Sequence, residues 1–80
     1  MPDRILRLPE VKSFCATSRS TIYLHISEGL FPKPIHLGVR AVGWPESEIA
    51  ALTAARIRGA TTDEIRALVV KLEAARRSAA

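Results

Sequence analysis

The residues best suited to chemistry lie in one short stretch, Ser18-Arg19-Ser20-Thr21-Ile22-Tyr23. It carries hydroxyl groups on four side chains and a guanidinium on a fifth. Such groups donate hydrogen bonds to phosphate oxygens and to the edges of nucleic-acid bases. If Ser18 caps a helix, the free amides of the first turn add a further anion site. The pattern therefore favours recognition of an anionic partner over catalysis.

A second group of polar side chains follows closely, on Lys33, His36 and Arg40. Lys33 stands between two prolines, so it is held on a stiff, extended segment that costs little to order for a contact. Arg40 lies at or just after the tip of a predicted turn, where an exposed arginine can reach a phosphate or a minor groove. His36 is as compatible with a strand face as with a contact.

Catalytic and metal chemistry are poorly supported. The chain has no nucleophile motif, and Glu46 and Glu48, two apart on a predicted helix, point in different directions. The single cysteine, Cys15, and the two histidines lack the paired short spacing of zinc sites. One cysteine also rules out an intramolecular disulfide, which fits a reducing, cytoplasmic setting. We therefore expect no catalytic residue, no metal ligand and no enzyme activity.

The net charge of the 80-residue chain is +4, and the excess lies in its first half. Residues 1–45 hold six Lys or Arg against three acids, whereas residues 46–80 hold six against five. This balance favours a polyanion, nucleic acid first and an acidic membrane surface second. No membrane partner is expected, because the apolar runs are too short, no secretory signal is present and acids interleave with the later cations. Few aromatics, with Phe14 and Trp44 expected in the core, disfavour single-stranded RNA.

The hydroxyl-rich stretch is predicted to lie on the second of two closely linked helices. Pro9 favours a first helix over residues 9–15, and Ser18 caps a second over residues 19–28. Ile22 and Ile26 face the core, and Gly29 ends the second helix. Because the link between the helices is so short, a helix-turn-helix pair is predicted, with a plain helical hairpin as the alternative.

A β-hairpin is predicted to follow this pair, because Pro32 and Pro34 exclude a helix. Residues 35–37 alternate in polarity as a strand does, residues 38–40 form a turn, and residues 41–44 return as the partner strand. The hairpin is a wing, and Trp44 is expected to close it onto the body of the domain.

Two further helices are predicted after the hairpin. Pro45 starts the third, whose apolar positions are Ile49, Leu52 and Ile57, and Gly59 ends it. A capping box precedes the fourth helix, residues 62–77. This helix either folds back onto the first helix or pairs with a second copy, and we favour packing on the body of the domain, with a weak dimer as a side effect. Its cations are expected to remain solvated: Arg66, Lys71, Arg76 and Arg77. The predicted fold is mainly α with a small β-hairpin, a winged helix-turn-helix over residues 1–60 and a C-terminal helix over 61–80 that packs on the domain or at a dimer interface.

Several segments together resemble the AlpA family of phage and prophage regulators, in uninterrupted order over about residues 7–58. They are Arg7-Leu8-Pro9-Glu10-Val11, Ser18-Arg19-Ser20-Thr21-Ile22-Tyr23, Phe31-Pro32-Lys33-Pro34, Leu37-Gly38-Val39-Arg40-Ala41-Val42-Gly43-Trp44 and Glu46-Ser47-Glu48-Ile49. The resemblance implies an excisionase-like, MerR-type winged helix that binds DNA without a cofactor. This chain departs from the family by carrying Leu24 and His25 where members often place a cation, and by continuing into a fourth helix.

The sequence thus predicts a transcriptional regulator that inserts helix 19–28 into the major groove of double-stranded DNA and uses hairpin 35–44 as a wing. Arg19 is the candidate for a base contact, to guanine. The predicted DNA-binding residues are Ser18, Arg19, Ser20, Thr21, Tyr23, His25, Lys33, His36 and Arg40. The alternatives are an excisionase-like architectural factor and a protein adaptor acting through helix 62–77. A second copy of the chain, RNA polymerase and a recombinase are further candidate partners.

Overall fold

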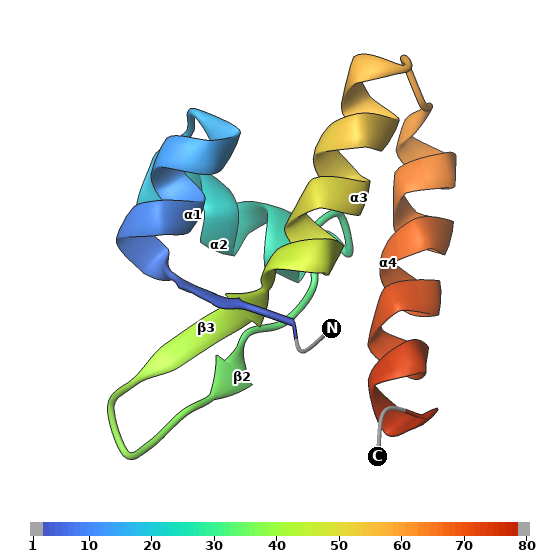
Figure 1. Ribbon diagram of the computed structural model, residues 1–80. Coiled ribbons are helices and arrows are strands. Elements are labelled where there is room, and N and C mark those ends of the chain that lie inside the picture. Colours follow the sequence, from blue (N-terminus) through green and yellow to red (C-terminus); the bar gives the residue numbers. More distant parts are fainter. Residues whose placement is uncertain (1–2, 79–80) are drawn as a thin grey trace.

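The computed structural model describes residues 3–78, which form four helices and a three-stranded antiparallel sheet (Figure 1). The predicted fold class, mainly helical with a small sheet, is confirmed. Residues 1–2 and 79–80 of the two predicted units lie outside the described part. In chain order the elements are β1 (Ile5–Arg7), α1 (Leu8–Cys15), α2 (Arg19–Ser27), β2 (Ile35–His36), β3 (Val42–Pro45), α3 (Glu46–Ile57) and α4 (Thr62–Ser78).

The tight link between α1 and α2 is built by a reversal of the backbone at Ala16, which adopts the left-handed conformation with φ 51°. The amides of Ala16 and Thr17 donate to the carbonyls of Ser13 and Lys12, so the last turn of α1 is closed. Ser18 then caps α2 by accepting from the Thr21 amide at 3.3 Å. The two predicted helices are therefore present. Helix α1 begins one residue earlier than predicted, and α2 ends one residue earlier.

The sheet has the order β1-β3-β2, so the predicted hairpin β2–β3 gains a third strand. This strand, β1, was not predicted; it pairs with β3 through Leu6 opposite Trp44. The alternation of charged and aliphatic residues at 4–8 is the signal that indicates it. The expectation that Pro45 starts a helix is wrong, because Pro45 ends β3 opposite Ile5 and α3 begins at Glu46.

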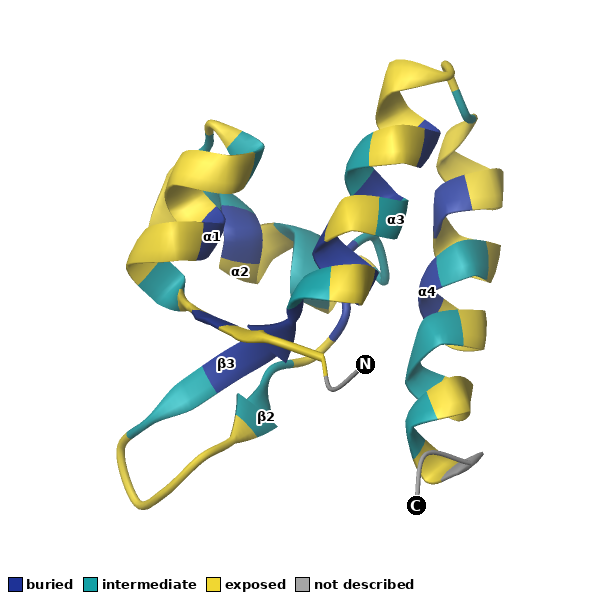
Figure 2. Ribbon diagram, viewed as in Figure 1, coloured by how far each residue is buried: buried dark blue, intermediate teal, exposed yellow. Residues whose placement is uncertain are grey.

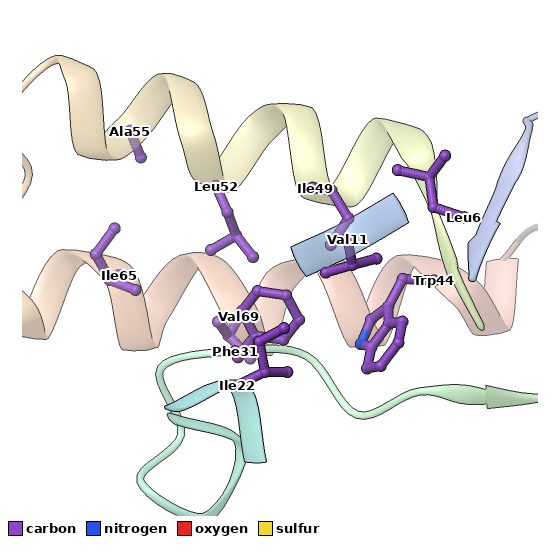
Figure 3. Packing of buried hydrophobic residues seen from close by; sticks show 10 residues of the cluster. All are labelled: Leu6, Val11, Ile22, Phe31, Trp44, Ile49, Leu52, Ala55, Ile65 and Val69. Carbon is purple, nitrogen blue, oxygen red and sulfur yellow. The ribbon is translucent and has the colours of Figure 1, made fainter. Parts of the chain in front are cut away.

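The core lies between the sheet, α1, α2 and the pair α3–α4, and Trp44 is at its centre with no exposed surface. Its indole Nε1 donates to the Pro32 carbonyl at 2.8 Å, and the Phe31 ring meets it edge-on at 5.8 Å. The close-up in Figure 3 labels the ten buried residues: Leu6, Val11, Ile22, Phe31, Trp44, Ile49, Leu52, Ala55, Ile65 and Val69. The expected burial of Trp44 is confirmed.

Two apolar residues that were expected inside lie at the surface. Phe14 is 44% exposed and Ile57 is 82% exposed. The inward face of α1 is centred on Val11, and Phe14 stands at its edge. Ile57 lies on the side of α3 nearly opposite Leu52, because five helical positions turn the side chain away from the buried face. The apolar character of Phe14 and Ile57 therefore led to a prediction of more burial than the structure shows.

Helix α4 packs alongside α3, and it buries Ile65 and Val69 (Figures 1 and 2). The expected capping box is confirmed: the Thr61 amide donates to Glu64 Oε1 at 2.9 Å, and the Glu64 amide donates to Thr61 Oγ1 at 3.2 Å. Helix α4 lies on the body of the domain, but its principal neighbour is α3 and not the first helix, which was one of the two surfaces considered. None of the helices in residues 3–78 is long and apolar enough to cross a membrane.

The expectation that all four late cations are solvated is also wrong. Arg76 forms a two-bond ion pair with Glu48, at 2.8 Å from Nε and 2.5 Å from Nη2, and Glu48 is only 5% exposed. Arg66 donates from Nε to the Glu28 carbonyl at 3.0 Å. Lys71 and Arg77 are exposed as expected.

Candidate nucleic-acid interface

The outward side of α2 carries three of the nine residues that were predicted to bind DNA. Ile22 is completely buried and Ile26 packs against the core, so they fix which side of the helix faces inward. Arg19, Ser20 and Tyr23 are exposed as a consequence. These three side chains can reach a ligand without any change in the core.

Both ends of α2 are well defined, which holds this outward side in place. At the carboxyl end, Gly29 adopts φ 76°, and the Leu30 amide donates to the His25 carbonyl at 2.8 Å. A residue with a side chain rarely adopts this conformation, so glycine is the natural stop. At the amino end, Ser18 supplies the cap described above.

Three hydroxyl groups gather at the amino end of α2. Ser18 Oγ donates to Thr21 Oγ1 at 2.9 Å, and Ser20 Oγ lies 3.3 Å from Ser18 Oγ. Ser18 is thus a helix cap whatever else it binds, and Thr21 is half-buried with its hydroxyl already engaged. The amides of the first helical turn have no partner inside a helix, and together with the Ser20 hydroxyl they suit a phosphate oxygen.

Arg19 lies over the ring of Tyr23, with its guanidinium carbon 5.6 Å from the ring centroid. The two residues are one helical turn apart, and Tyr23 is 39% exposed. A cation over an aromatic face gains about 0.5–1 kcal/mol at an exposed site. This contact orders the long arginine side chain on the surface of α2 and leaves its planar donors available for a bidentate contact.

Leu24 is a candidate contact that the residue-by-residue reading of the sequence did not select. It is 55% exposed and lies on the side of α2 opposite the buried Ile22 and Ile26. An apolar side chain at such a position can contact the methyl group of thymine in the major groove. The sequence signal for this contact was the spacing of Leu24. It stands four residues after Ser20, on the same side of the helix, and two residues after the core residue Ile22, on the opposite side.

His25 does not share the outward side with Arg19 and Tyr23. It is half-buried and lines a cavity of about 380 Å³ between α2 and the carboxyl-terminal half of α3. Phe14, Cys15 and Arg56 line the same cavity. A ligand that lies against Arg19, Ser20 and Tyr23 would therefore not contact His25 from the same side of α2.

The wing presents the remaining predicted residues. Lys33, His36 and Arg40 are all exposed, and Figure 2 shows the loop between β2 and β3 as a continuous exposed segment. The Leu37 amide donates to the Ala41 carbonyl at 2.8 Å, which closes the loop. Val39 at its tip is fully exposed. The loop extends away from the helices in Figure 1, and Arg40 in this loop is exposed.

The chemistry of Cys15 is that of a structural residue. Burial raises the pKa of its thiol above the ordinary value, although nearby Arg56 and a hydrogen bond with Thr53 act in the opposite direction. A raised pKa keeps the thiol protonated and poorly nucleophilic near neutral pH. Within residues 3–78 no group of three His, Cys, Asp or Glu side chains could hold a metal ion.

Comparison with known proteins gives matches of two kinds. The sequence profile of the family described as prophage CP4-57 regulatory protein (AlpA) matches residues 4–57. The uncharacterized protein ORF88 of Enterobacteria phage P4 is 49% identical over 57 residues, 71% of this chain and 65% of that protein. The DNA-binding transcriptional activator AlpA of Escherichia coli (strain K12) is 44% identical over 52 residues, 58% of this chain and 74% of that protein. No solved structure gives a significant match.

The extent of these matches defines what is shared. This chain covers slightly less than two thirds of the length of the phage P4 protein. The family profile spans β1 to the last residue of α3, so it contains both α2 and the hairpin. Helix α4 begins at Thr62 and lies beyond the matched residues.

Proposed function

Because this chain belongs to the AlpA family of prophage regulatory proteins, we propose that it is a phage-type regulator that binds a specific double-stranded DNA sequence. In this proposal α2 lies in the major groove, and the hairpin β2–β3 contacts the neighbouring backbone or minor groove as a wing. The major groove admits an α-helix and presents a different donor and acceptor pattern for each base pair.

The exposed side of α2 carries this proposal. Ile22 is buried on the inward side of α2, whereas Arg19, Ser20 and Tyr23 are exposed on the outward side. The inward side therefore stabilises the fold, and the outward side is free to contact a partner. Guanidinium, hydroxyl and the apolar Leu24 together match the kinds of group that read base edges in the major groove.

The residues divide into two roles. Arg19 and Leu24 read bases, Arg19 through a bidentate contact to guanine and Leu24 through a thymine methyl. Ser18, Ser20, Thr21 and Tyr23 position the helix on phosphates at its amino end, and Lys33, His36 and Arg40 do the same from the wing. His25, which lines the cavity, supports α2 from beside the interface.

Selection from a randomised duplex DNA pool at near-physiological salt tests this function. Enrichment of one sequence is the expected result; inverted half-sites would indicate a symmetric dimer, and direct repeats would indicate head-to-tail loading. If nothing is enriched and all binding disappears as salt rises, only non-specific phosphate attraction remains and the proposal fails.

Two other functions are less well supported. An excisionase-like architectural factor would use the same surface, and it would be distinguished by bending of the selected duplex. A protein adaptor acting through α4 is disfavoured, because the apolar stripe of α4, centred on Ile65 and Val69, is occupied by contacts within the chain. RNA polymerase and a recombinase remain candidate partners of the DNA-bound protein.

A further inference from the structure

Helix α4 reaches beyond α3 to both elements of the proposed DNA interface. Arg66 Nε donates to the carbonyl of Glu28, the residue that closes the carboxyl end of α2, at 3.0 Å. The aliphatic part of the Arg66 side chain passes within 4 Å of the space above Gly29. A guanidinium at this end also complements the negative pole of the helix dipole. Arg66 therefore ties α4 to the end of α2.

A second contact ties α4 to the start of the wing. The backbone amide of Lys33 donates to Glu73 Oε2 at 2.8 Å. Lys33 lies between the buried Pro32 and the half-buried Pro34, on the segment that leads directly into β2 at Ile35. Because prolines stiffen this segment, an anchor at Lys33 constrains the strand that follows.

A third contact fixes α4 itself to α3. Arg76 holds the buried Glu48 through two hydrogen bonds, and the paired geometry sets both the position and the rotation of α4. Ile65 and Val69 of the same helix are buried in the core. Glu73 and Arg66 are thus presented from a helix that cannot easily slide.

From these three contacts we infer that α4 is a positioning element, in which Glu73 and Arg66 hold the wing and the end of α2 in one fixed relation so that both engage the same DNA site. The inference rests on the proposed function. It is specific to this chain's extension, since α4 lies outside the residues that match the family. A wing that is free to move would lose conformational entropy each time it binds DNA, and this loss would weaken the affinity.

Glu73 allows a matched test, because Glu73→Gln keeps an acceptor oxygen for the Lys33 amide whereas Glu73→Ala removes it. Both variants change the net charge by the same amount, so their general attraction to DNA is equal. We expect Glu73→Gln to bind the selected duplex at least as tightly as the parent, because it loses one negative charge, and Glu73→Ala to bind it about three- to tenfold more weakly than Glu73→Gln. Affinity for an unrelated duplex should be the same for both.

A double-mutant cycle with Arg40→Ala separates positioning from a loss of stability. If Glu73 acts through the wing, Glu73→Ala costs less in a chain whose wing has already lost its Arg40 contact than in the parent chain. Thermal unfolding followed by circular dichroism checks that binding is measured well below the unfolding midpoint of every variant. Equal affinities of Glu73→Ala and Glu73→Gln, or an undiminished loss in the Arg40→Ala background, would overturn the inference. Failure of the parent chain to select any duplex would instead overturn the proposed function.

Discussion

At the scale of single residues, the contact between Arg19 and Tyr23 orders the outward side of α2. A free arginine loses rotamer freedom worth about 2 kcal/mol when it is fixed in a complex. The Tyr23 ring 5.6 Å below the guanidinium carbon restricts that freedom before binding. The aromatic residue would therefore lower the entropic cost of the base contact that we propose for Arg19.

Replacement of Arg19 by alanine is expected to relax the sequence preference of the chain. A bidentate contact to guanine discriminates against other bases by about 1–3 kcal/mol, and this discrimination would be lost at one position of the selected site. The measurement is the affinity of Arg19→Ala for the selected duplex and for duplexes altered at each position. Lys33→Ala is the control, because loss of a phosphate contact weakens all sequences alike. The assigned docking surface is wrong if neither change affects binding.

Cys15 offers a pH-dependent prediction at the same scale. Burial raises the pKa of its thiol, so the folded state disfavours the thiolate. The stability contributed by this neutral thiol is present below the pKa of the unfolded chain and is lost as pH rises through the higher pKa of the folded chain. We expect alkylation by iodoacetamide to rise at higher pH in the folded chain than in urea. A midpoint in the folded chain at or below that of the unfolded chain would contradict this.

At the scale of elements, the sequence predicted those features that local rules determine. Ser18 and Gly29 delimit α2, and Thr61 with Glu64 starts α4, because capping depends on residues within one turn. The sequence reasoning missed β1, a strand of three residues whose pairing depends on β3, some forty residues away. It also placed Ile57 inside, since residue type alone does not show where a neighbouring element stops covering a helix.

The pairing of β1 with β3 makes Gly43 essential for the small sheet. A Cβ at this position would lie 2.5 Å from Ile5 Cγ2, 3.0 Å from the Leu6 carbonyl oxygen and 3.1 Å from Leu37 Cδ1. We expect Gly43→Ala to lower the free energy of unfolding by about 1–3 kcal/mol, because β1 must shift to accept the methyl group. Urea unfolding measures the change.

Gly38 in the wing loop supplies the control for this prediction. Nothing lies within 4 Å of a Cβ at Gly38, and its backbone is outside the left-handed region. Gly38→Ala should therefore change the free energy of unfolding by no more than about 0.5 kcal/mol. If the two alanine variants unfold at the same urea concentration, close approach of β1 is not what requires glycine at 43.

At the scale of the whole molecule, the family and the general fold could be predicted, but the arrangement of α4 could not. The order of the segments that resemble the family over residues 7–58 was enough to predict the family, and the match over residues 4–57 confirms it. The partner of Arg76 was not predictable, since Glu48 stands 28 residues earlier and the spacing of charges on one helix says nothing about another. The predicted DNA-binding residues stay a prediction until a duplex is selected.

The Glu48–Arg76 pair matters to the entire fold, because a chain of 80 residues has a small core and a small margin of stability. Arg76→Ala would leave the Glu48 carboxylate, 7% exposed, without its partner. We expect a loss of about 3 kcal/mol in the free energy of unfolding, the usual cost of an uncompensated buried charge. Chemical unfolding of the full chain is the measurement.

Two further variants decide whether the cost comes from the unpaired charge. Arg77→Ala removes the same charge from an exposed neighbouring position and should change the free energy of unfolding by less than about 0.5 kcal/mol. The double variant Glu48→Leu with Arg76→Leu removes both charges, so it should recover most of the loss that Arg76→Ala causes. Equal destabilisation by Arg76→Ala and Arg77→Ala would show that α4 is held by its apolar stripe alone. In that case Ile65 and Val69, rather than the ion pair, would set where α4 presents Arg66 and Glu73 to the rest of the molecule.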